Sequence, residues 1–447
     1  MSPHLIKNVT IVNEGKIFIG DIRIKNGLIE EVGALEASAT DVVIDGTGKY
    51  LLPGVIDGQV HFREPGLTHK ADLYTESKAA VAGGVTSFID MPNTLPNVLN
   101  MDTLNEKYQI AAEKSLANFG FFLGVNGDNL DEVIKLDTSR LLAVSDDGLY
   151  FTKKGNLLAD NPDTLEKLFA HCKAFIAIHA EKEQIIEANE HQYKEKYGDD
   201  VPVQFHPVIR SVDACYQASK QAIELANKHN ARLHILHLTT EAETHLFRND
   251  IPLKEKKITT EVSVQHLWFS DKDYERLGTL IKWNPAIKSE KDKDGLLQAL
   301  IDDRIDIITT DHAPHTIEEK QKPYFQSMSG APMIQHALNV MLEFHQQGKI
   351  SLEKIVEKMC HNPATLYGLE KRGFIREGYY ADLVLVDMNV LWEVNKENVL
   401  YKCGWSPLEG TTFHSKVTHT FVNGHLVFEN GAFHEEKRGM PLHRMSH

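Results

Sequence analysis

The sequence predicts a (β/α)8 barrel of the TIM type that is inserted into a small β-sandwich formed by both ends of the chain. Two observations predict it: alternating segments centred on Asn-Gly at 26–27 and 423–424, and eight strand-like runs between them. We expect the N-terminal part of the sandwich at 1–53, the barrel at 54–372, and the C-terminal part with the tail at 373–447.

The two ends of the chain are rich in short strands. Residues 21–32 and 418–428 alternate apolar and polar side chains around a central Asn-Gly, which is a strong signal for a two-residue hairpin. Residues 381–387 add a further strand. Because an isolated hairpin is only marginally stable in water, we expect these terminal pieces to pair with each other.

The middle of the chain alternates strand-like and helical segments. The strand-like runs are 51–56, 85–91, 119–125, 141–145, 175–179, 232–238, 258–264 and 305–310. The clearest helical stretch follows Ser211, a favourable N-cap, and repeats small apolar residues on one face. Eight strands with crossover helices are the pattern of a (β/α)8 barrel.

Composition limits the classes of partner. A chain of 447 residues with 42% hydrophobic residues can form a barrel with a large core and an accessory domain. The net charge of −15 argues against nucleic acid or an anionic membrane as the main partner. The negative net charge does not exclude an anionic substrate, because a site can be locally basic.

Cysteine usage and the N-terminus predict a cytoplasmic protein. The four cysteines, Cys172, Cys215, Cys360 and Cys403, lie far apart without a Cys-x-x-Cys pair, which argues against a zinc ribbon or a disulfide scaffold. No long apolar segment follows the first residues, so we expect neither a signal peptide nor a membrane span.

Ionisable side chains stand at the carboxyl ends of the strand-like runs. They are His61, the pair Asp146 and Asp147, His179, His237 and Asp311. One histidine in such a place is more often structural than a ligand, but these ends converge on one face of a barrel, where active sites of this architecture lie. Nitrogen and carboxylate ligands without cysteine favour Zn²⁺, with Mn²⁺ or Co²⁺ as alternatives.

Six motifs along the chain carry a resemblance to a known family. They are 57–66 (Asp-Gly-Gln-Val-His-Phe-Arg-Glu-Pro-Gly), 179–181 (His-Ala-Glu), 234–240 (His-Ile-Leu-His-Leu-Thr-Thr), 284–288 (Asn-Pro-Ala-Ile-Lys), 310–315 (Thr-Asp-His-Ala-Pro-His) and 362–364 (Asn-Pro-Ala). They resemble the dihydroorotases, within the cyclic amidohydrolases. The likeness extends from about residue 5 to residue 440, and the motif at 310–315 is among the most specific of that family.

The resemblance implies a metal centre. Its ligands would be His61, Asp147, His179, His237 and Asp311. Asp147 would bridge, as in the class of dihydroorotases whose bridging group is an aspartate instead of a carboxylated lysine. Its neighbour Asp146 stays an alternative, because the segment that follows is atypical.

One ligand position departs from the family. Gln59 stands where the family usually has a histidine for the more exposed metal. A neutral amide oxygen is a poor replacement for imidazole at zinc. We therefore expect one or two Zn²⁺ ions per chain, in one well-occupied site and one weaker site. The first would be formed by Asp147, His179 and His237, and the second would lie near His61, Gln59 and Asp311.

The implied reaction is the hydrolysis of a cyclic amide. A zinc ion lowers the pKa of its bound water from about 16 to about 7, which makes hydroxide available at neutral pH. Asp311 would accept the proton of the water as a general base and then give it to the departing nitrogen as a general acid.

The resemblance also implies the substrate contacts. Arg63 resembles the carboxylate-binding arginine of the family, and a guanidinium binds carboxylates bidentately. The other implied contacts are Asn93, Asn284, His315 and Ala331, the last in a loop at 326–332 that we expect to line the pocket.

The function implied is that of a dihydroorotase, which interconverts (S)-dihydroorotate and N-carbamoyl-L-aspartate in pyrimidine biosynthesis. A second hypothesis is a catalytically impaired homologue that serves as a partner of aspartate carbamoyltransferase. A third is another cyclic amidohydrolase, of the allantoinase or hydantoinase kind. Beyond the small-molecule substrate, homodimerisation and the association with aspartate carbamoyltransferase stay open.

Overall fold

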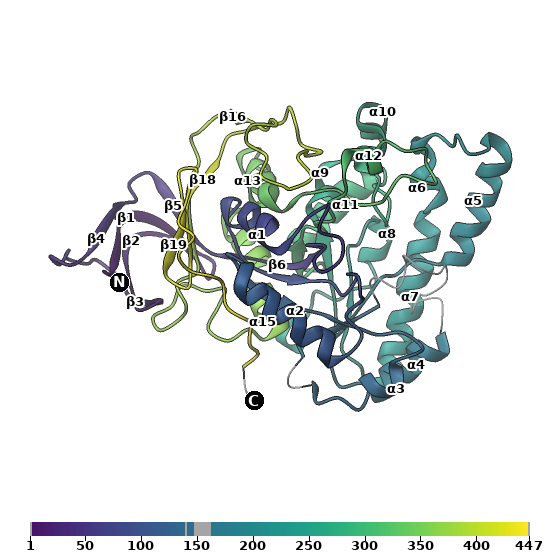
Figure 1. Ribbon diagram of the computed structural model, residues 1–447, viewed down its shortest axis with the longest axis horizontal. Helices are drawn as coiled ribbons and strands as arrows, with labels where there is room; N and C mark the ends of the chain where they lie inside the picture. The colour runs from purple at the N-terminus through teal and green to yellow at the C-terminus, as the bar shows by residue number, and fades with distance from the viewer. Residues whose placement is uncertain (1, 139–140, 147–161, 446–447) are drawn as a thin grey trace.

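Eight strand positions form a parallel barrel in the computed structural model, which describes residues 2–138, 141–146 and 162–445 (Figure 1). The strands are β6 (Val55–Val60), β7 (Val85–Asp90), β8 (Asn118–Phe121) with its continuation β9 (Leu123–Gly124), β10 (Val144–Ser145), β11 (Ile176–Ile178), β12 (Leu233–Ile235), β13 (Ile258–Ser263) and β14 (Ile307–Thr309). The barrel closes where the backbone N–H of His61 donates to the carbonyl oxygen of His312, at 2.8 Å. The predicted fold class is confirmed.

Helices cover the outside of the barrel. They are α1 (Leu73–Ala82), α2 (Met101–Lys114), α3 (Leu130–Val133), α4 (Pro162–His171), α5 (Glu183–Tyr197), α6 (His206–Ile209), α7 (Val212–His229), α8 (Glu241–Thr244), α9 (Val264–Trp268), α10 (Tyr274–Leu277), α11 (Glu290–Ile301), α12 (Ile317–Lys320), α13 (Ala337–Gln346), α14 (Leu352–Val356) and α15 (Asn362–Tyr367). Helix α7 begins as the sequence predicts, because the Ser211 side chain accepts from the backbone N–H of Ala214 at 3.2 Å.

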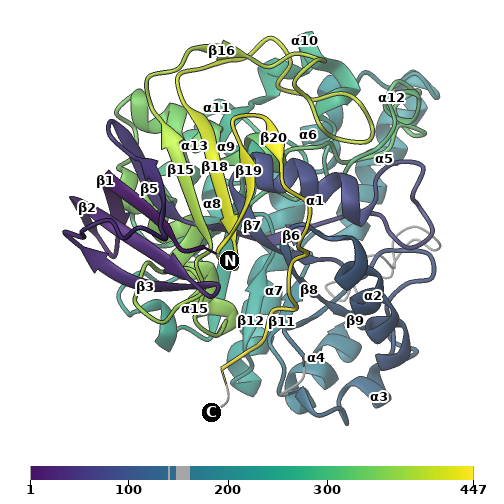
Figure 2. The same cartoon turned by 60° about the vertical axis from the view of Figure 1, so that its left-hand side comes forward.

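Strands from both ends of the chain form one nine-stranded sheet beside the barrel (Figure 2). They are β1 (His4–Asn13), β2 (Lys16–Lys25), β3 (Leu28–Gly33), β4 (Val42–Asp45), β5 (Lys49–Pro53), β15 (Leu383–Asp387), β18 (Lys416–Val422), β19 (His425–Glu429) and β20 (Ala432–Phe433). The two halves meet where β5 pairs antiparallel with β15. A separate pair, β16 (Trp392–Glu393) and β17 (Thr412–Phe413), lies outside this sheet.

The two Asn-Gly turns that the sequence singles out contact each other. Asn26 and Gly27 have φ angles of 54° and 86°, and Asn423 and Gly424 have φ angles of 51° and 72°, which are the left-handed conformations of tight hairpin turns. A Cβ at Gly424 would lie 2.7 Å from the Cα atom of Gly27. Glycine is therefore required there both by the backbone conformation and by the close approach of the two turns.

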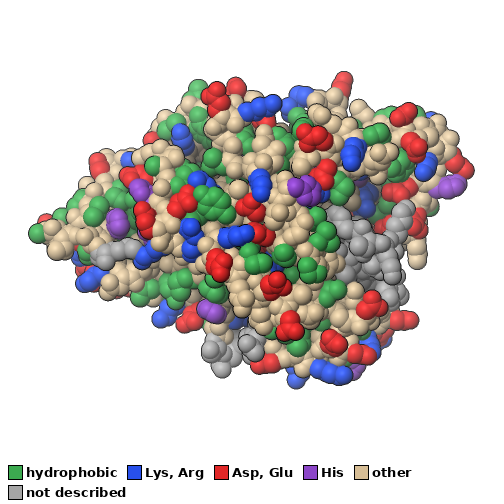
Figure 3. Space-filling view, viewed as in Figure 1, with side chains coloured by type: hydrophobic (Ala, Val, Ile, Leu, Met, Phe, Trp, Pro, Cys, Tyr) green, Lys and Arg blue, Asp and Glu red, His purple; other side chains and the backbone are tan. Residues whose placement is uncertain are grey.

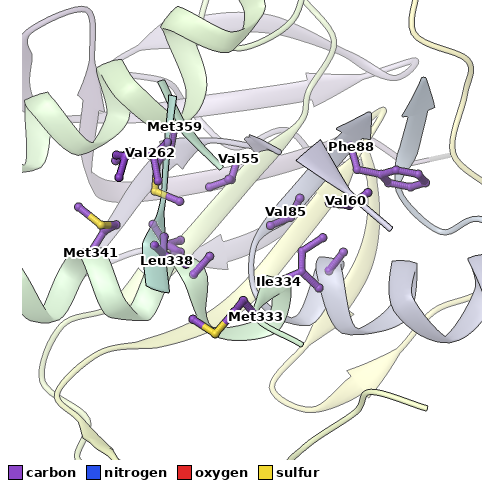
Figure 4. Close-up of a cluster of buried hydrophobic side chains, with 14 of the residues drawn as sticks. Val55, Val60, Val85, Phe88, Val262, Met333, Ile334, Leu338, Met341 and Met359 are labelled. Atoms are coloured by element: carbon purple, nitrogen blue, oxygen red, sulfur yellow. The ribbon is translucent and has the colours of Figure 1, made fainter. Parts of the chain in front are cut away.

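Apolar side chains from the barrel strands and from the segment that leads into α13 form part of the main core (Figure 4). Val60, Phe88, Ile334 and Met341 are among its members, and each of them is fully buried. Burial of a side chain of this size stabilises the fold by about 1.5–3 kcal/mol. This packing holds the barrel strands in place, and active sites of this architecture lie at the carboxyl ends of such strands.

The face of the molecule that Figure 3 shows is mixed in charge. Basic and acidic side chains are interspersed over it. None of the helices in the described residues combines the length and the apolar character needed to cross a bilayer.

Candidate active site at the carboxyl ends of the barrel strands

A cavity of about 340 Å³ opens at the carboxyl ends of the barrel strands. Its lining includes His61, Arg63, Asn93, His179, His237, Trp283, Asn284 and Asp311, together with Ala313, Phe325 and residues 327–330. Strands that are far apart in sequence therefore deliver most of the predicted site residues to one place, as the barrel geometry requires.

His61 and Asp311 form a hydrogen-bonded pair across the closing seam of the barrel. Nε2 of His61 lies 3.0 Å from Oδ1 of Asp311, and Nδ1 of His61 lies 2.9 Å from Oδ1 of Asn93. Both ring nitrogens of His61 are thus engaged. The contacts hold the Asp311 carboxylate in a fixed orientation at the cavity wall.

His179 and His237 form a second pair, with ring centroids 4.8 Å apart. Asp146 is fully buried, and its Oδ1 lies 3.0 Å from both the backbone nitrogen and Nδ1 of His179. A carboxylate bonded to one ring nitrogen leaves the lone pair of the other nitrogen available to an ion. Burial, reinforced by the neighbouring His179 ring, lowers the pKa of His237 well below its usual value. A neutral imidazole is the form that binds metals.

The donors at this pair fit one divalent ion. Two imidazoles bound to one tetrahedral zinc have their centroids roughly 5 Å apart, given Zn–N distances of about 2 Å. The Nδ1 atom of His237 is buried and has no hydrogen-bond partner among the described residues. Over residues 2–138, 141–146 and 162–445, however, no three His, Cys, Asp or Glu side chains gather closely enough to hold an ion. The predicted third ligand, Asp147, lies outside the described residues.

Gln59 occupies a buried position in β6, two residues before His61. Its exposed fraction is 0%, and in the part of the chain that the structure describes neither its amide nitrogen nor its amide oxygen has a hydrogen-bond partner. An unsatisfied buried polar group costs about 1–3 kcal/mol. A buried amide of this kind needs a water molecule or an ion as its partner.

Asp57, two residues before Gln59, ties the first barrel strand to the last. It accepts from the backbone N–H of Thr310 at 3.1 Å and also from the hydroxyl of Thr310. Burial raises the pKa of Asp57 to about 7. These bonds fix the turn that presents Asp311.

Three residues of the cavity have left-handed backbone conformations. The φ angles are 67° at Arg63, 32° at His237 and 45° at Asp311. Such a conformation costs of order 1–3 kcal/mol at a residue with a Cβ, and it concentrates at functional sites. The three strained residues coincide with predicted functional positions.

Arg63 is held at the cavity wall by the segment that follows β14. The side chain is 2% exposed, its Nε donates to the carbonyl oxygen of Pro314 at 3.2 Å, and one terminal nitrogen lies 3.1 Å from Nε2 of His315. His315 is fully buried and lies behind Arg63, outside the cavity lining. Ala331 is also buried, and its carbonyl oxygen accepts from the N–H of Ala313 at 3.1 Å.

Two buried lysines that the sequence analysis did not single out hold the loop 324–330, most of which lines the cavity. Nζ of Lys320 donates to the carbonyl oxygens of Lys282, Met328 and Gly330, at 3.0, 2.8 and 2.8 Å. Nζ of Lys282 donates to two further carbonyl oxygens of the loop, at 2.7 Å each. A lysine in a polar segment is normally solvated, so the sequence carries no signal for this role.

Comparisons with known proteins agree with this architecture. The model of the Amidohydrolase family matches residues 50–427. The chain is 33% identical over 417 residues to a dihydroorotase of Methanosarcina acetivorans, covering 91% of this chain and 88% of that protein. It is 32% identical over 428 residues to a dihydroorotase of Pyrococcus abyssi, covering 95% of each.

Among solved structures, the fold is similar to an L-hydantoinase (dihydropyrimidinase) from Arthrobacter aurescens. The TM-score is 0.90 at 27% identity, over 99% of this chain and 100% of that chain. A dihydropyrimidinase from Brevibacillus agri has a TM-score of 0.85 at 24% identity, over 96% of each chain, and shows the shared fold alone.

Proposed function

The chain belongs to the amidohydrolase family, and on that premise we propose that it is a dihydroorotase. It would catalyse the reversible hydrolysis of the cyclic amide of (S)-dihydroorotate to N-carbamoyl-L-aspartate, in the cytoplasm. The observation that carries the proposal is the guanidinium of Arg63 in the wall of the cavity that also holds Asp311. A cation at that place suits a ring that bears a carboxylate.

We propose that His179 and His237, with Asp147 or Asp146 as the carboxylate, hold one Zn²⁺ ion. When bound, such an ion makes hydroxide available at neutral pH and polarises a carbonyl oxygen. Asp146 would keep the His179 ring in one orientation through the contact at its Nδ1 atom. His61 and Gln59 would serve a second, weaker ion at most, because Gln59 offers only a neutral amide.

Asp311 would move the proton. Its carboxylate faces the cavity and is oriented by His61, which Asn93 fixes in turn. In the hydrolytic direction Asp311 accepts a proton from the attacking water and delivers it to the ring nitrogen as the C–N bond breaks. The reverse direction uses the same steps in the opposite order.

Arg63 would bind the carboxylate, and the amides of Asn93 and Asn284 would contact the ring. All three side chains line the cavity. A volume of about 340 Å³ lies near the small end of the range for ligand pockets, which suits a single small ring.

A hydantoinase is the second candidate, favoured by the structural similarity to the Arthrobacter aurescens enzyme. An assay with both substrates distinguishes a dihydroorotase from a hydantoinase. Hydantoin carries no carboxylate, so its binding gains nothing from the guanidinium of Arg63. A catalytically impaired homologue that binds aspartate carbamoyltransferase is the third, favoured by Gln59. Wild-type turnover discriminates it from the other two.

The test is turnover of dihydroorotate and of N-carbamoyl-L-aspartate by purified protein, with hydantoin assayed in parallel and the metal content measured on the same sample. We expect turnover in both directions, with dihydroorotate preferred over hydantoin. Preference for hydantoin would support the second candidate. Metal-loaded protein that turns over none of the three compounds would overturn the proposal.

A further inference from the structure

Lys70 is a buried lysine that lies behind the cavity wall. Its side chain is 6% exposed, and Nζ lies 3.1 Å from Nδ1 of His315 and 2.9 Å from Oε1 of Glu319. Lys70 does not line the cavity. A buried ammonium that contacts an imidazole and a carboxylate is expensive to desolvate, so its placement calls for a structural or functional reason.

The contacts on the other side of the ring indicate the tautomer of His315. Nε2 of His315 lies 3.1 Å from the carbonyl oxygen of Ser329. A carbonyl oxygen only accepts, so this hydrogen bond requires the proton on Nε2. In a neutral ring Nδ1 is then an acceptor, and the ammonium of Lys70 is the donor that fills it. The opposite tautomer would accept at Nε2 from a terminal nitrogen of Arg63, which also lies at 3.1 Å, and would donate from Nδ1 to Glu319 Oε2 at 3.5 Å. The Nε2–H tautomer makes two hydrogen bonds of 3.1 Å, to Ser329 and from Lys70, whereas the opposite one makes only one of that length, so the contacts favour Nε2–H.

The charges that face His315 keep the ring neutral. Burial, together with the nearby cations Arg63, Lys70 and Lys320, holds the pKa of His315 well below its usual value, although Glu319 opposes this effect. Burial alone would raise the pKa of Glu319, but the ammonium of Lys70, at 2.9 Å from Oε1, keeps that pKa well below its usual range. Glu319 is therefore ionised, and its negative charge compensates the positive charge of Lys70.

Ser329 connects this cluster to the cavity. Its hydroxyl donates to Oδ1 of Asn284 at 3.1 Å, and both residues line the cavity. A continuous series of contacts thus runs from Glu319 through Lys70, His315 and Ser329 to Asn284. Arg63 lies against the same imidazole, at 3.1 Å from Nε2.

We propose that Lys70 is a positioning residue for the substrate cavity, which fixes His315 in the Nε2–H tautomer and thereby holds Ser329 and Asn284 in place beside Arg63. The role in catalysis rests on the proposed function, because it assumes that the cavity binds the substrate. The tautomer itself does not depend on that assumption.

The kinetic test compares Lys70→Met with wild type. Without the ammonium, Glu319 is the nearest charge to Nδ1. The neutral ring can then move its proton to Nδ1 and lose the bond to Ser329, whereas at lower pH a second proton on Nδ1 would leave that bond in place. We expect the KM for dihydroorotate to rise about tenfold, the value of one hydrogen bond, while kcat stays within about twofold. The KM of the variant should also depend on pH between about 5.5 and 8, which that of wild type should not.

Two further variants separate this role from a general loss of stability. Lys70→Arg keeps a cationic donor and should restore most of the wild-type KM. Lys402→Met removes a different ion pair of the same region, Lys402 with Asp72 at 2.7 Å, and should leave the KM unchanged. A pH-independent KM in Lys70→Met, equal to that of wild type, would contradict the proposal.

The direct test needs no turnover. Imidazole ¹⁵N chemical shifts of His315, assigned by comparison with His315→Gln, report which ring nitrogen carries the proton in wild-type protein. We expect a protonated Nε2 and an unprotonated Nδ1, and a protonated Nδ1 would overturn the inference. If wild type fails to hydrolyse dihydroorotate, the proposed function fails, while the ¹⁵N shifts still decide the tautomer.

Discussion

Nε2 of His61 lies 3.0 Å from Oδ1 of Asp311, and this contact joins the ends of the first and last strands of the barrel. The backbone N–H of His61 also donates to the carbonyl oxygen of His312, at 2.8 Å. The seam where the barrel closes is therefore the place where the proposed proton-transfer group is held. Substitutions at this seam should therefore lower kcat more than they raise KM.

Asp311→Asn tests the proton-transfer role. An asparagine has the same shape and can still accept from His61, so we expect the fold, the metal content and the KM for dihydroorotate to stay near wild type. Removal of the general base should lower kcat by about 10²–10⁴-fold. Steady-state kinetics with metal analysis of the same preparation measure both effects. A kcat within tenfold of wild type would assign proton transfer to another group.

Gln59→His tests the departure from the usual ligand set. The buried amide has no hydrogen-bond partner among the described residues, and an imidazole would supply the nitrogen ligand that zinc prefers. We expect the zinc content to rise from about one towards two ions per chain, with higher activity.

The matched control for that change is Gln265→His. Gln265 is equally buried, and within the described residues its amide atoms likewise lack partners, but it lies in α9, whereas Gln59 lies in β6, two residues before His61. It should leave the zinc content unchanged. Two equally tight ions in wild-type protein would mean that another group compensates for Gln59.

Arg63→Ala tests the carboxylate site. The guanidinium would contact a group that is present in the ground state and the transition state alike, so its loss should mainly raise KM. A charged hydrogen bond contributes about 1.5–3 kcal/mol, which corresponds to a rise of roughly ten- to hundredfold for dihydroorotate. Hydantoin, which lacks the carboxylate, should be affected far less. An unchanged KM for dihydroorotate would weaken the choice of substrate.

The burial of Lys282 should make the free energy of unfolding depend on pH. Burial, with Arg210 nearby, lowers the pKa of Lys282 to about 7, whereas in the unfolded chain a lysine has a pKa of about 10.4. Between these values the unfolded chain binds more protons, so this residue adds stability as the pH rises from about 7 towards 10.

The measurement is the free energy of unfolding in urea at pH 6.5 and pH 9, for wild type and Lys282→Met. Wild type should gain stability relative to the variant at the higher pH. Lys322→Met, which changes an exposed lysine near the same loop, is the control. A relative loss of stability at pH 9 would mean that the two carbonyl contacts, at 2.7 Å, outweigh the cost of burying the charge.

The sequence by itself determined the fold class and the face of the barrel on which the site lies. Hydrophobic periodicity and the paired Asn-Gly turns are local signals, and a parallel barrel brings its strand ends together whatever the loops do. The convergence of His61, His179, His237 and Asp311 on one cavity follows from that geometry.

Only the tertiary structure decided how the loops support those groups. The burial of Lys70 against His315 and the bonds from Lys282 and Lys320 to the loop 324–330 involve segments far apart in the sequence. The ammonium of a lysine is solvated by default, and it becomes a fixed donor only when packing removes its water and supplies acceptors. That balance depends on the three-dimensional path of each loop, which residue periodicity does not encode.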